Sequence, residues 1–122
     1  MNLGIIGLGL IGGSMAIDLK RKGFARKVFG VESDPVNAAA AEKIGLVDKV
    51  VSLEECVAEC DVIVLAVPVG AAAGLLQLVL DTFQQAGAAD KVVIDVCSTK
   101  ERLTECVKAH PYRKNYVATH PM

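Results

Sequence analysis

The sequence has few aromatic residues and no long tract of like charges. Only 4% of its 122 residues are aromatic whereas 52% are hydrophobic, so the core is expected to consist mainly of Val, Ile, Leu and Ala. This hydrophobic share is high for a short chain with a large surface-to-volume ratio, and some apolar surface is therefore expected to face a partner. The 13 basic and 14 acidic residues form no basic cluster, which argues against a nucleic-acid surface.

The chain also lacks a membrane-spanning stretch, a targeting segment and a paired-cysteine motif. No apolar run is long enough to cross a bilayer. Residues 3–17 have the hydrophobicity of a signal-peptide core, but five glycines interrupt them and no positive flank precedes them. The four cysteines form no CxxC, which is typical of reduced thiols in the cytoplasm. Cys56 and Cys60 lie one helical turn apart, and packing is favoured over a metal site because nothing local completes a ligand set.

Apolar runs of strand length alternate with stretches of helix length along the whole chain. Strands are predicted at 3–6, 27–31, 49–51, 61–67, 91–95 and 116–119. Helices are predicted at 10–22, from 33–35 to 43, from 52 to about 57, and at about 70–85 and 99–109. Ser33 or Asp34 can cap the second helix, Pro35 fits its first turn, and Ser52 can cap the third. The run DVIVLAV at 61–67 is apolar on both faces, as in a central parallel strand. The alternation predicts a single α/β domain with a mainly parallel six-stranded sheet and helices on both faces.

The stretch GLGLIGGS follows the first predicted strand and opens the first predicted helix. Its glycines match G-x-G-x-x-G: the first permits a tight turn, the second lets a pyrophosphate approach the backbone, and the third lets the helix pack closely on the sheet. Amides at the helix N-terminus then face the anion. The predicted phosphate loop consists of Gly7, Leu8, Gly9, Leu10, Ile11 and Gly12. This motif makes the predicted sheet a doubly wound one of the Rossmann type.

An acidic residue, Glu32, follows the second predicted strand, 20 residues after Gly12. In a dinucleotide-binding unit, an acid at this place accepts hydrogen bonds from the adenosine ribose and repels a 2′-phosphate. Ser33 and Asp34 come next, so no arginine stands beside the acid, and NAD is favoured over NADP. The alternative is that Glu32 merely caps a neighbouring helix.

The remaining strand ends supply further candidates, because ligands of such sheets bind at the carboxyl ends of the strands. A cofactor ribose or nicotinamide can lie over the turn at Val67 and Pro68. Ser98 follows the fifth strand, where it can both cap a helix and face the crevice. His120 follows the sixth strand and can serve as a general base near neutral pH. Two other residues are interpreted as structural or solvated, namely His110 at a helix end and Lys100.

Three motifs, GLGLIGGS, DVCSTK and ATHPM, together with the turn VPV, occur in an order and spacing that resemble the prephenate dehydrogenase family, including the arogenate dehydrogenases. The resemblance implies NAD-dependent oxidative decarboxylation of prephenate to 4-hydroxyphenylpyruvate in tyrosine biosynthesis. It implies that His120 accepts the proton of the ring hydroxyl and that Ser98 hydrogen-bonds the same hydroxyl and helps seat the nicotinamide. Cys97 lies where many members have glycine.

The resemblance covers residues 1–122 as the NAD-binding domain, without the helical domain that supplies the family's dimer interface and much of its substrate pocket. We therefore expect this chain to bind NAD, with no metal, and to turn over substrate poorly or not at all, as part of a cytoplasmic homodimer. Arogenate in place of prephenate and a stand-alone NAD-binding module without catalysis remain alternatives. Another NAD-dependent reductase, such as a β-hydroxyacid dehydrogenase or a pyrroline-carboxylate reductase, is less favoured because the ATHPM motif does not belong to the pattern of those families.

Overall fold

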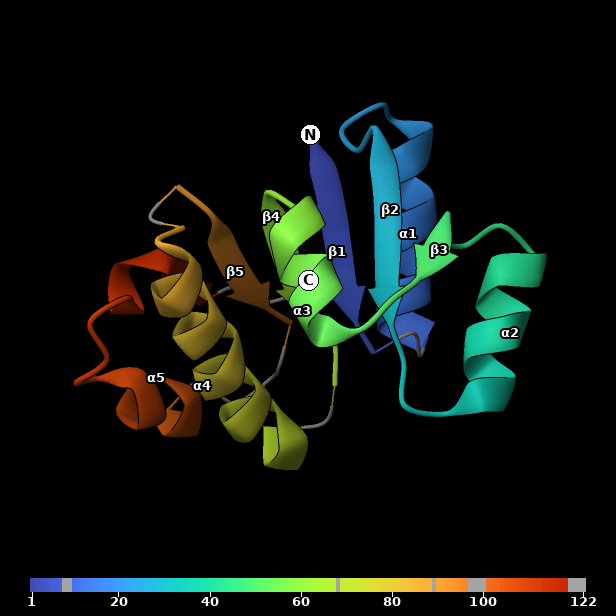
Figure 1. Cartoon of the computed structure of the whole chain (residues 1–122). Helices are drawn as coiled ribbons and strands as arrows, with labels where there is room; N and C mark the ends of the chain where they lie inside the picture. The colour runs from blue at the N-terminus through green and yellow to red at the C-terminus, as the bar shows by residue number, and fades with distance from the viewer. Residues whose placement is uncertain (8–9, 68, 89, 97–100, 119–122) are drawn as a thin grey trace.

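The computed structural model describes residues 1–7, 10–67, 69–88, 90–96 and 101–118 and has strands and helices alternating along the chain (Figure 1). The strands are β1 (Asn2–Ile6), β2 (Lys27–Val31), β3 (Lys49–Val50), β4 (Val62–Leu65), β5 (Val92–Asp95) and β6 (Tyr116–Ala118). The helices are α1 (Leu10–Arg21), α2 (Pro35–Lys43), α3 (Leu53–Glu59), α4 (Val69–Ala86), α5 (Glu101–Val107) and a 3₁₀ turn, η1 (Arg113–Asn115). Each predicted strand and helix is present. Some bounds differ: β4 is shorter at both ends than the apolar run that predicted it, and α5 ends at Val107, two residues before the predicted end.

The six strands form one sheet in the order β3-β2-β1-β4-β5-β6, and every pairing is parallel. β1 lies in the interior, where Leu3 pairs with Val28 of β2 on one side and Val62 of β4 on the other. The chain runs outward from β1 to β3, then returns and runs outward again from β4 to β6. The strand order therefore reverses between β1 and β4, where the carboxyl ends of a doubly wound sheet leave a crevice for ligands.

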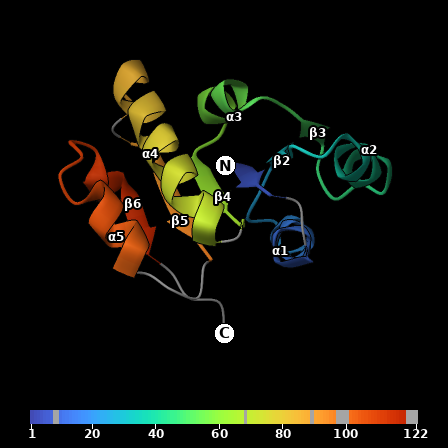
Figure 2. The ribbon, with the colours of Figure 1, turned by 90° about the horizontal axis from the view of Figure 1, so that it is seen from below.

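Helices cover both faces of the sheet, as predicted, and each face has its own apolar cluster (Figure 2). On one face, Ala16 of α1 and Ala41 of α2 pack against strand residues such as Val28 and Val64. On the other face, α3, α4 and α5 pack on the opposite side chains of the same strands. Both faces of the central strands are thus buried, which explains why their sequences are continuously apolar.

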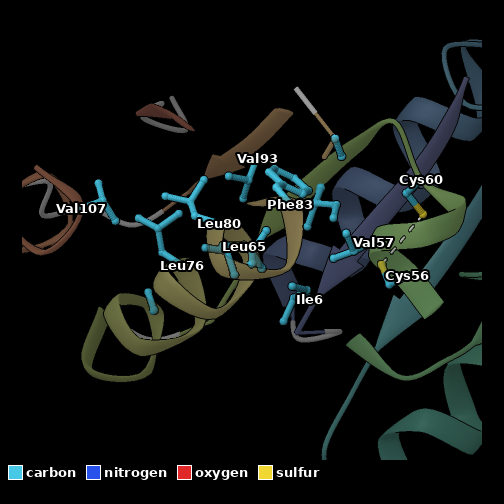
Figure 3. Close-up of a cluster of buried hydrophobic side chains, with 14 of the residues drawn as sticks. Ile6, Cys56, Val57, Cys60, Leu65, Leu76, Leu80, Phe83, Val93 and Val107 are labelled. Carbon is cyan, nitrogen blue, oxygen red and sulfur yellow. Dashed lines mark hydrogen bonds between the residues drawn. The ribbon is translucent and has the colours of Figure 1, made fainter. Parts of the chain in front are cut away.

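The longest helix, α4, contributes the centre of the larger cluster (Figure 3). Leu76, Leu80 and Phe83 are fully buried there and lie at the 3–4-residue spacing that places side chains on one helix face. With so few aromatic residues in the chain, Phe83 is the largest fully buried side chain. The expected aliphatic core is therefore observed. Among the described residues, no helix is both long enough and apolar enough to cross a membrane.

Cys56 and Cys60 belong to the same cluster and lie on the face of α3 that covers β1. Both side chains are fully buried, and their sulfur atoms are 3.9 Å apart (Figure 3). A Cβ atom added to Gly4 would lie 2.4 Å from the sulfur of Cys56, so the glycine lets α3 approach the sheet. The hydrogen bond between the sulfur atoms and burial raise the pKa of the Cys60 thiol, whereas the same hydrogen bond lowers the pKa of Cys56, so the packing role rests on the complete burial of both side chains. Within the described ranges, no three His, Cys, Asp or Glu side chains are grouped to hold a metal ion.

Polar side chains cap the N-termini of two helices and connect two others. Asp34, one of the two predicted candidates, caps α2 by accepting the N–H groups of Val36 and Asn37, and Ser52 caps α3. After α5, the Nε2 atom of His110 lies 2.7 Å from a carboxylate oxygen of Asp81 on α4. His110 thus joins two helices, in agreement with its interpretation as a structural residue.

Candidate functional site

A small cavity opens at the carboxyl edge of the sheet, where the strand order reverses. It has a volume of about 130 Å³ and is lined from three strand ends and one helix. The lining residues are Ile6, Gly7, Val31, Glu32, Ser33, Val67 and Leu75. The structure thus brings together four of the residues predicted to bind a cofactor, namely Gly7, Glu32, Ser33 and Val67.

Gly7 forms the floor of this cavity and requires glycine for two independent reasons. Its φ angle is +93°, a conformation that L side chains rarely adopt. A Cβ atom would also lie 2.6 Å from the carbonyl oxygen of Ala66 and 2.7 Å from a methyl carbon of Val67. The amide of Gly7 donates a 2.9 Å hydrogen bond to the carbonyl of Val31. The turn after β1 is therefore held against the ends of both neighbouring strands, β2 and β4.

The helix that follows this turn begins at Leu10, so Leu10, Ile11 and Gly12 form the first turn of α1. The first amides of a helix have no partner within it, and they face an anion with the positive end of the helix dipole. Placed directly after the turn at Gly7, this end of a 12-residue helix suits a phosphate group. Leu8 and Gly9, the other members of the predicted loop, lie outside the described residues.

Glu32 follows β2 directly and lines the cavity with a half-buried side chain. One of its carboxylate oxygens accepts the N–H of Asp34 at 3.1 Å. Because Asp34 caps α2 with its own side chain, the helix does not depend on Glu32 for an N-cap. The N-cap of α2 is thus Asp34 rather than Glu32, and the Glu32 side chain lines the cavity, while its contact with a ribose stays a prediction.

The proposed catalytic residues are not in the described part of the chain. Ser98 and His120 lie outside the described residues, as do Pro68 and Lys100. The structure does describe the strands that lead to them: Asp95 is the last residue of β5 and pairs with Ala118, the last residue of β6.

Two residues near the site were missed by sequence reasoning. Leu75 reaches the cavity from α4. In the sequence it is only one more apolar residue beside the buried face of that helix, and nothing else indicates it. Asp95 is a fully buried carboxylate at the end of β5. In the sequence, Asp95 could have been recognised as a polar residue at the end of an otherwise apolar strand. It is also the first residue of the DVCSTK motif, which contains Ser98.

A larger hollow lies at the opposite edge of the sheet. It has a volume of about 410 Å³ and is lined by Lys91, Val92, Pro111, Tyr112, Lys114 and Asn115, around the start of β5. Ligands of open α/β sheets bind at the carboxyl ends of the strands, so the smaller cavity at Gly7 and Glu32 is the better candidate.

A parallel sheet in this order, with a glycine turn after β1, a helix N-terminus beyond it and an acid after β2, defines a dinucleotide-binding domain of the Rossmann type. The family model described as "Prephenate dehydrogenase, nucleotide-binding domain" matches residues 15–122. The chain belongs to this family. The family resemblance, the fold class and the nucleotide-binding function expected from the sequence are thereby confirmed.

Individual relatives agree with this assignment. The chain is 31% identical over 121 residues to the prephenate dehydrogenase of Bacillus subtilis, and the match covers 97% of this chain and 32% of the relative. It superimposes on prephenate dehydrogenase from A. aeolicus, solved in complex with hydroxyphenyl propionate and NAD+, with a TM-score of 0.81 and 26% identity over 100% of this chain and 42% of the other. Synechocystis arogenate dehydrogenase gives a TM-score of 0.79 and 27% identity, with 99% of this chain and 41% of the other covered. The chain spans about a third of the length of the curated relatives it matches.

Proposed function

We propose that the chain is the NAD-binding part of a prephenate dehydrogenase, an oxidoreductase that converts prephenate to 4-hydroxyphenylpyruvate in tyrosine biosynthesis. The observation that carries the proposal is the cavity that Gly7 and Glu32 line together, with α1 beginning at Leu10, three residues after Gly7. This arrangement supplies amide donors for a pyrophosphate and a carboxylate acceptor for a ribose diol. Dinucleotide-binding domains serve many dehydrogenase reactions, and membership of the prephenate dehydrogenase family favours the oxidation of prephenate among them.

The cofactor preference follows from the charges next to the cavity. Glu32 and Asp34 are both acidic and are joined by a hydrogen bond from the backbone of Asp34. A ribose 2′-hydroxyl can donate to the carboxylate of Glu32, whereas a 2′-phosphate would meet like charge. We infer that NAD is the cofactor and that NADP binds more weakly.

The chemical step is assigned to two residues that follow β5 and β6. His120 accepts the proton of the ring hydroxyl of prephenate, and Ser98 hydrogen-bonds the same hydroxyl and helps to seat the nicotinamide ring. The cofactor, when bound, takes the hydride from the carbon that bears this hydroxyl. Loss of carbon dioxide then makes the ring aromatic, which makes the overall reaction irreversible.

We further propose that this chain acts with a second, helical domain that completes the substrate pocket and forms a homodimer in the cytoplasm. The chain matches about a third of the relatives' length, which supports the proposal that cofactor binding and the rest of the substrate pocket belong to different domains. The chain by itself is expected to bind NAD and to convert prephenate poorly or not at all.

A titration of the chain with NAD and NADP tests the proposal through Glu32. Replacing Glu32 by alanine removes a charged hydrogen-bond acceptor, and such bonds contribute about 1.5–3 kcal/mol. The Kd for NAD should therefore rise about 10-fold or more, while the Kd for NADP changes little or falls. Isothermal titration calorimetry measures both constants on the same preparation.

Glu59→Ala is the matched control, because it removes an exposed glutamate near the start of β1, where the backbone carbonyl of Glu59 accepts from the Asn2 side chain. It should leave both constants unchanged. An NAD preference that persists in the Glu32 variant would show that the carboxylate does not contact the ribose. Failure of the unchanged chain to bind either cofactor would refute the proposed function itself.

A further inference from the structure

One buried charge has no role in the function proposed so far. Asp95, at the carboxyl end of β5, is fully buried and is the one polar or charged side chain in the buried class among the described residues. Its strand neighbours in register are Leu65 of β4, also fully buried, and Ala118 of β6. Removing a carboxylate from water is costly unless hydrogen bonds compensate for the lost hydration.

Tyr116 supplies such a bond from the neighbouring strand. Its hydroxyl donates to a carboxylate oxygen of Asp95 at 2.7 Å. In the register of the two strands, Tyr116 lies opposite Val93, and the side chains of Val93, Asp95 and Tyr116 share one face of the sheet. This hydrogen bond therefore joins the first residue of β6 to the last residue of β5.

The place of this bond in the sheet makes it significant. Within the described residues, β6 is an edge strand of three residues whose one strand partner is β5. A strand this short has few ladder hydrogen bonds, and terminal elements with few such bonds open most readily. A hydrogen bond to a buried carboxyl group is costly to lose because water does not readily replace it. The Tyr116 hydroxyl adds a side-chain hydrogen bond to a strand pair that has only three residues in register.

We propose that Asp95 and Tyr116 are positioning residues of the enzyme, whose hydrogen bond fixes the carboxyl ends of β5 and β6 relative to each other. The inference rests on the proposed function, because those strands lead directly to Ser98 and His120. Ser98 is the third residue after Asp95 and His120 is the second after Ala118, so the position of each strand end limits where these side chains can lie. The pair thus sets the geometry of the hydroxyl-binding serine and the base without touching the substrate.

Histidine NMR on the 122-residue chain tests this role without requiring turnover. The chain has only two histidines, so His110, held by Asp81 on α4, serves as an internal reference for His120. In Tyr116→Phe, which removes the hydroxyl and keeps the ring, the titration midpoint of His120 should shift by about half a pKa unit or more, a large part of the usual spread for histidine. Asp95→Asn should shift it as well, and the midpoint of His110 should stay in place in both variants.

The chain offers a matched control in Tyr112→Phe, the same chemical change at its other tyrosine. This variant should leave His120 unchanged. If His120 titrates identically in all variants, the pair is merely structural and the proposal is wrong, even where the melting temperature falls. If Asp95→Asn does not fold, Tyr116→Phe decides alone. A chain that fails to bind NAD refutes the proposed function, while the response of His120 still decides the positioning role.

Discussion

Replacing Gly7 by alanine tests how closely the turn after β1 is held against its neighbours. The variant must place a Cβ atom at a φ angle of +93°, and strain of this kind costs about 1–2 kcal/mol. The same atom would lie 2.6 Å from the backbone oxygen of Ala66, which cannot rotate away as a side chain can. Overpacking adds typically about 1–3 kcal/mol. The free energy of unfolding should therefore fall by about 2–5 kcal/mol, a large part of the ordinary stability of a domain.

Gly45→Ala separates the two contributions. Gly45 has a φ angle of +77°, and a Cβ atom there would have no neighbour within 4 Å. Its replacement carries the backbone strain and the same reduction of unfolded-chain entropy, but no steric clash. Urea unfolding of both variants measures the difference, which should be about 1–3 kcal/mol. Equal losses for the two variants would refute the inferred close approach of the turn to β4.

Two further predictions concern stability away from the site. Hydrogen bonds from the Lys20 side chain and from the backbone N–H of Val28 lower the pKa of Asp48. The ionised carboxylate therefore stabilises the fold at pH values above its unfolded pKa of about 4. This stabilisation is lost as the pH falls through the lower pKa of the folded state. Asp48→Asn should therefore reduce the free energy of unfolding at pH 7 by about 1 kcal/mol or less, since the pair is partly exposed, and the difference from the unchanged chain should shrink as the pH is lowered, as measured by urea titration. Leu80→Ala should cost about 2–5 kcal/mol because the side chain is fully buried. Leu78→Ala, on the exposed side of the same helix, should cost less than about 1 kcal/mol in the same assay, and similar losses would mean that the assigned helix face is wrong.

The fold was predictable from the sequence because its elements obey local rules. Continuous apolar runs such as VIVL marked the central strands, since both faces of a parallel sheet are covered. Asp34 and Pro35 marked the start of α2, one by its side-chain oxygen and the other by its fixed φ angle. The ends of β4 were predicted less well because pairing with the neighbouring strands, rather than hydrophobicity, decides where a strand stops.

The candidate site was predictable only where a motif carried it. Gly7 and Glu32 stand at fixed places in the strand-turn-helix unit, so their spacing in the sequence implied their meeting in space. The contact between Tyr116 and Asp95 joins residues 21 positions apart and depends on the pairing of β5 with β6. No local pattern encodes which strand lies beside which, and this contact therefore required the structure.

The interior position of β1 has a consequence for how the protein is made. β1 is synthesised before β2 and β4, and one of its edges can pair with β2 soon afterwards. The other edge must wait for β4, as shown by the N–H of Asn2, which donates to the carboxylate of Asp61, 59 residues later. At about 5–20 residues per second on the ribosome, this apolar edge stays open for about 3–12 s. Open strand edges invite pairing with other chains. Until β4 emerges, the side of β1 that faces β4 therefore has no strand partner within the nascent chain.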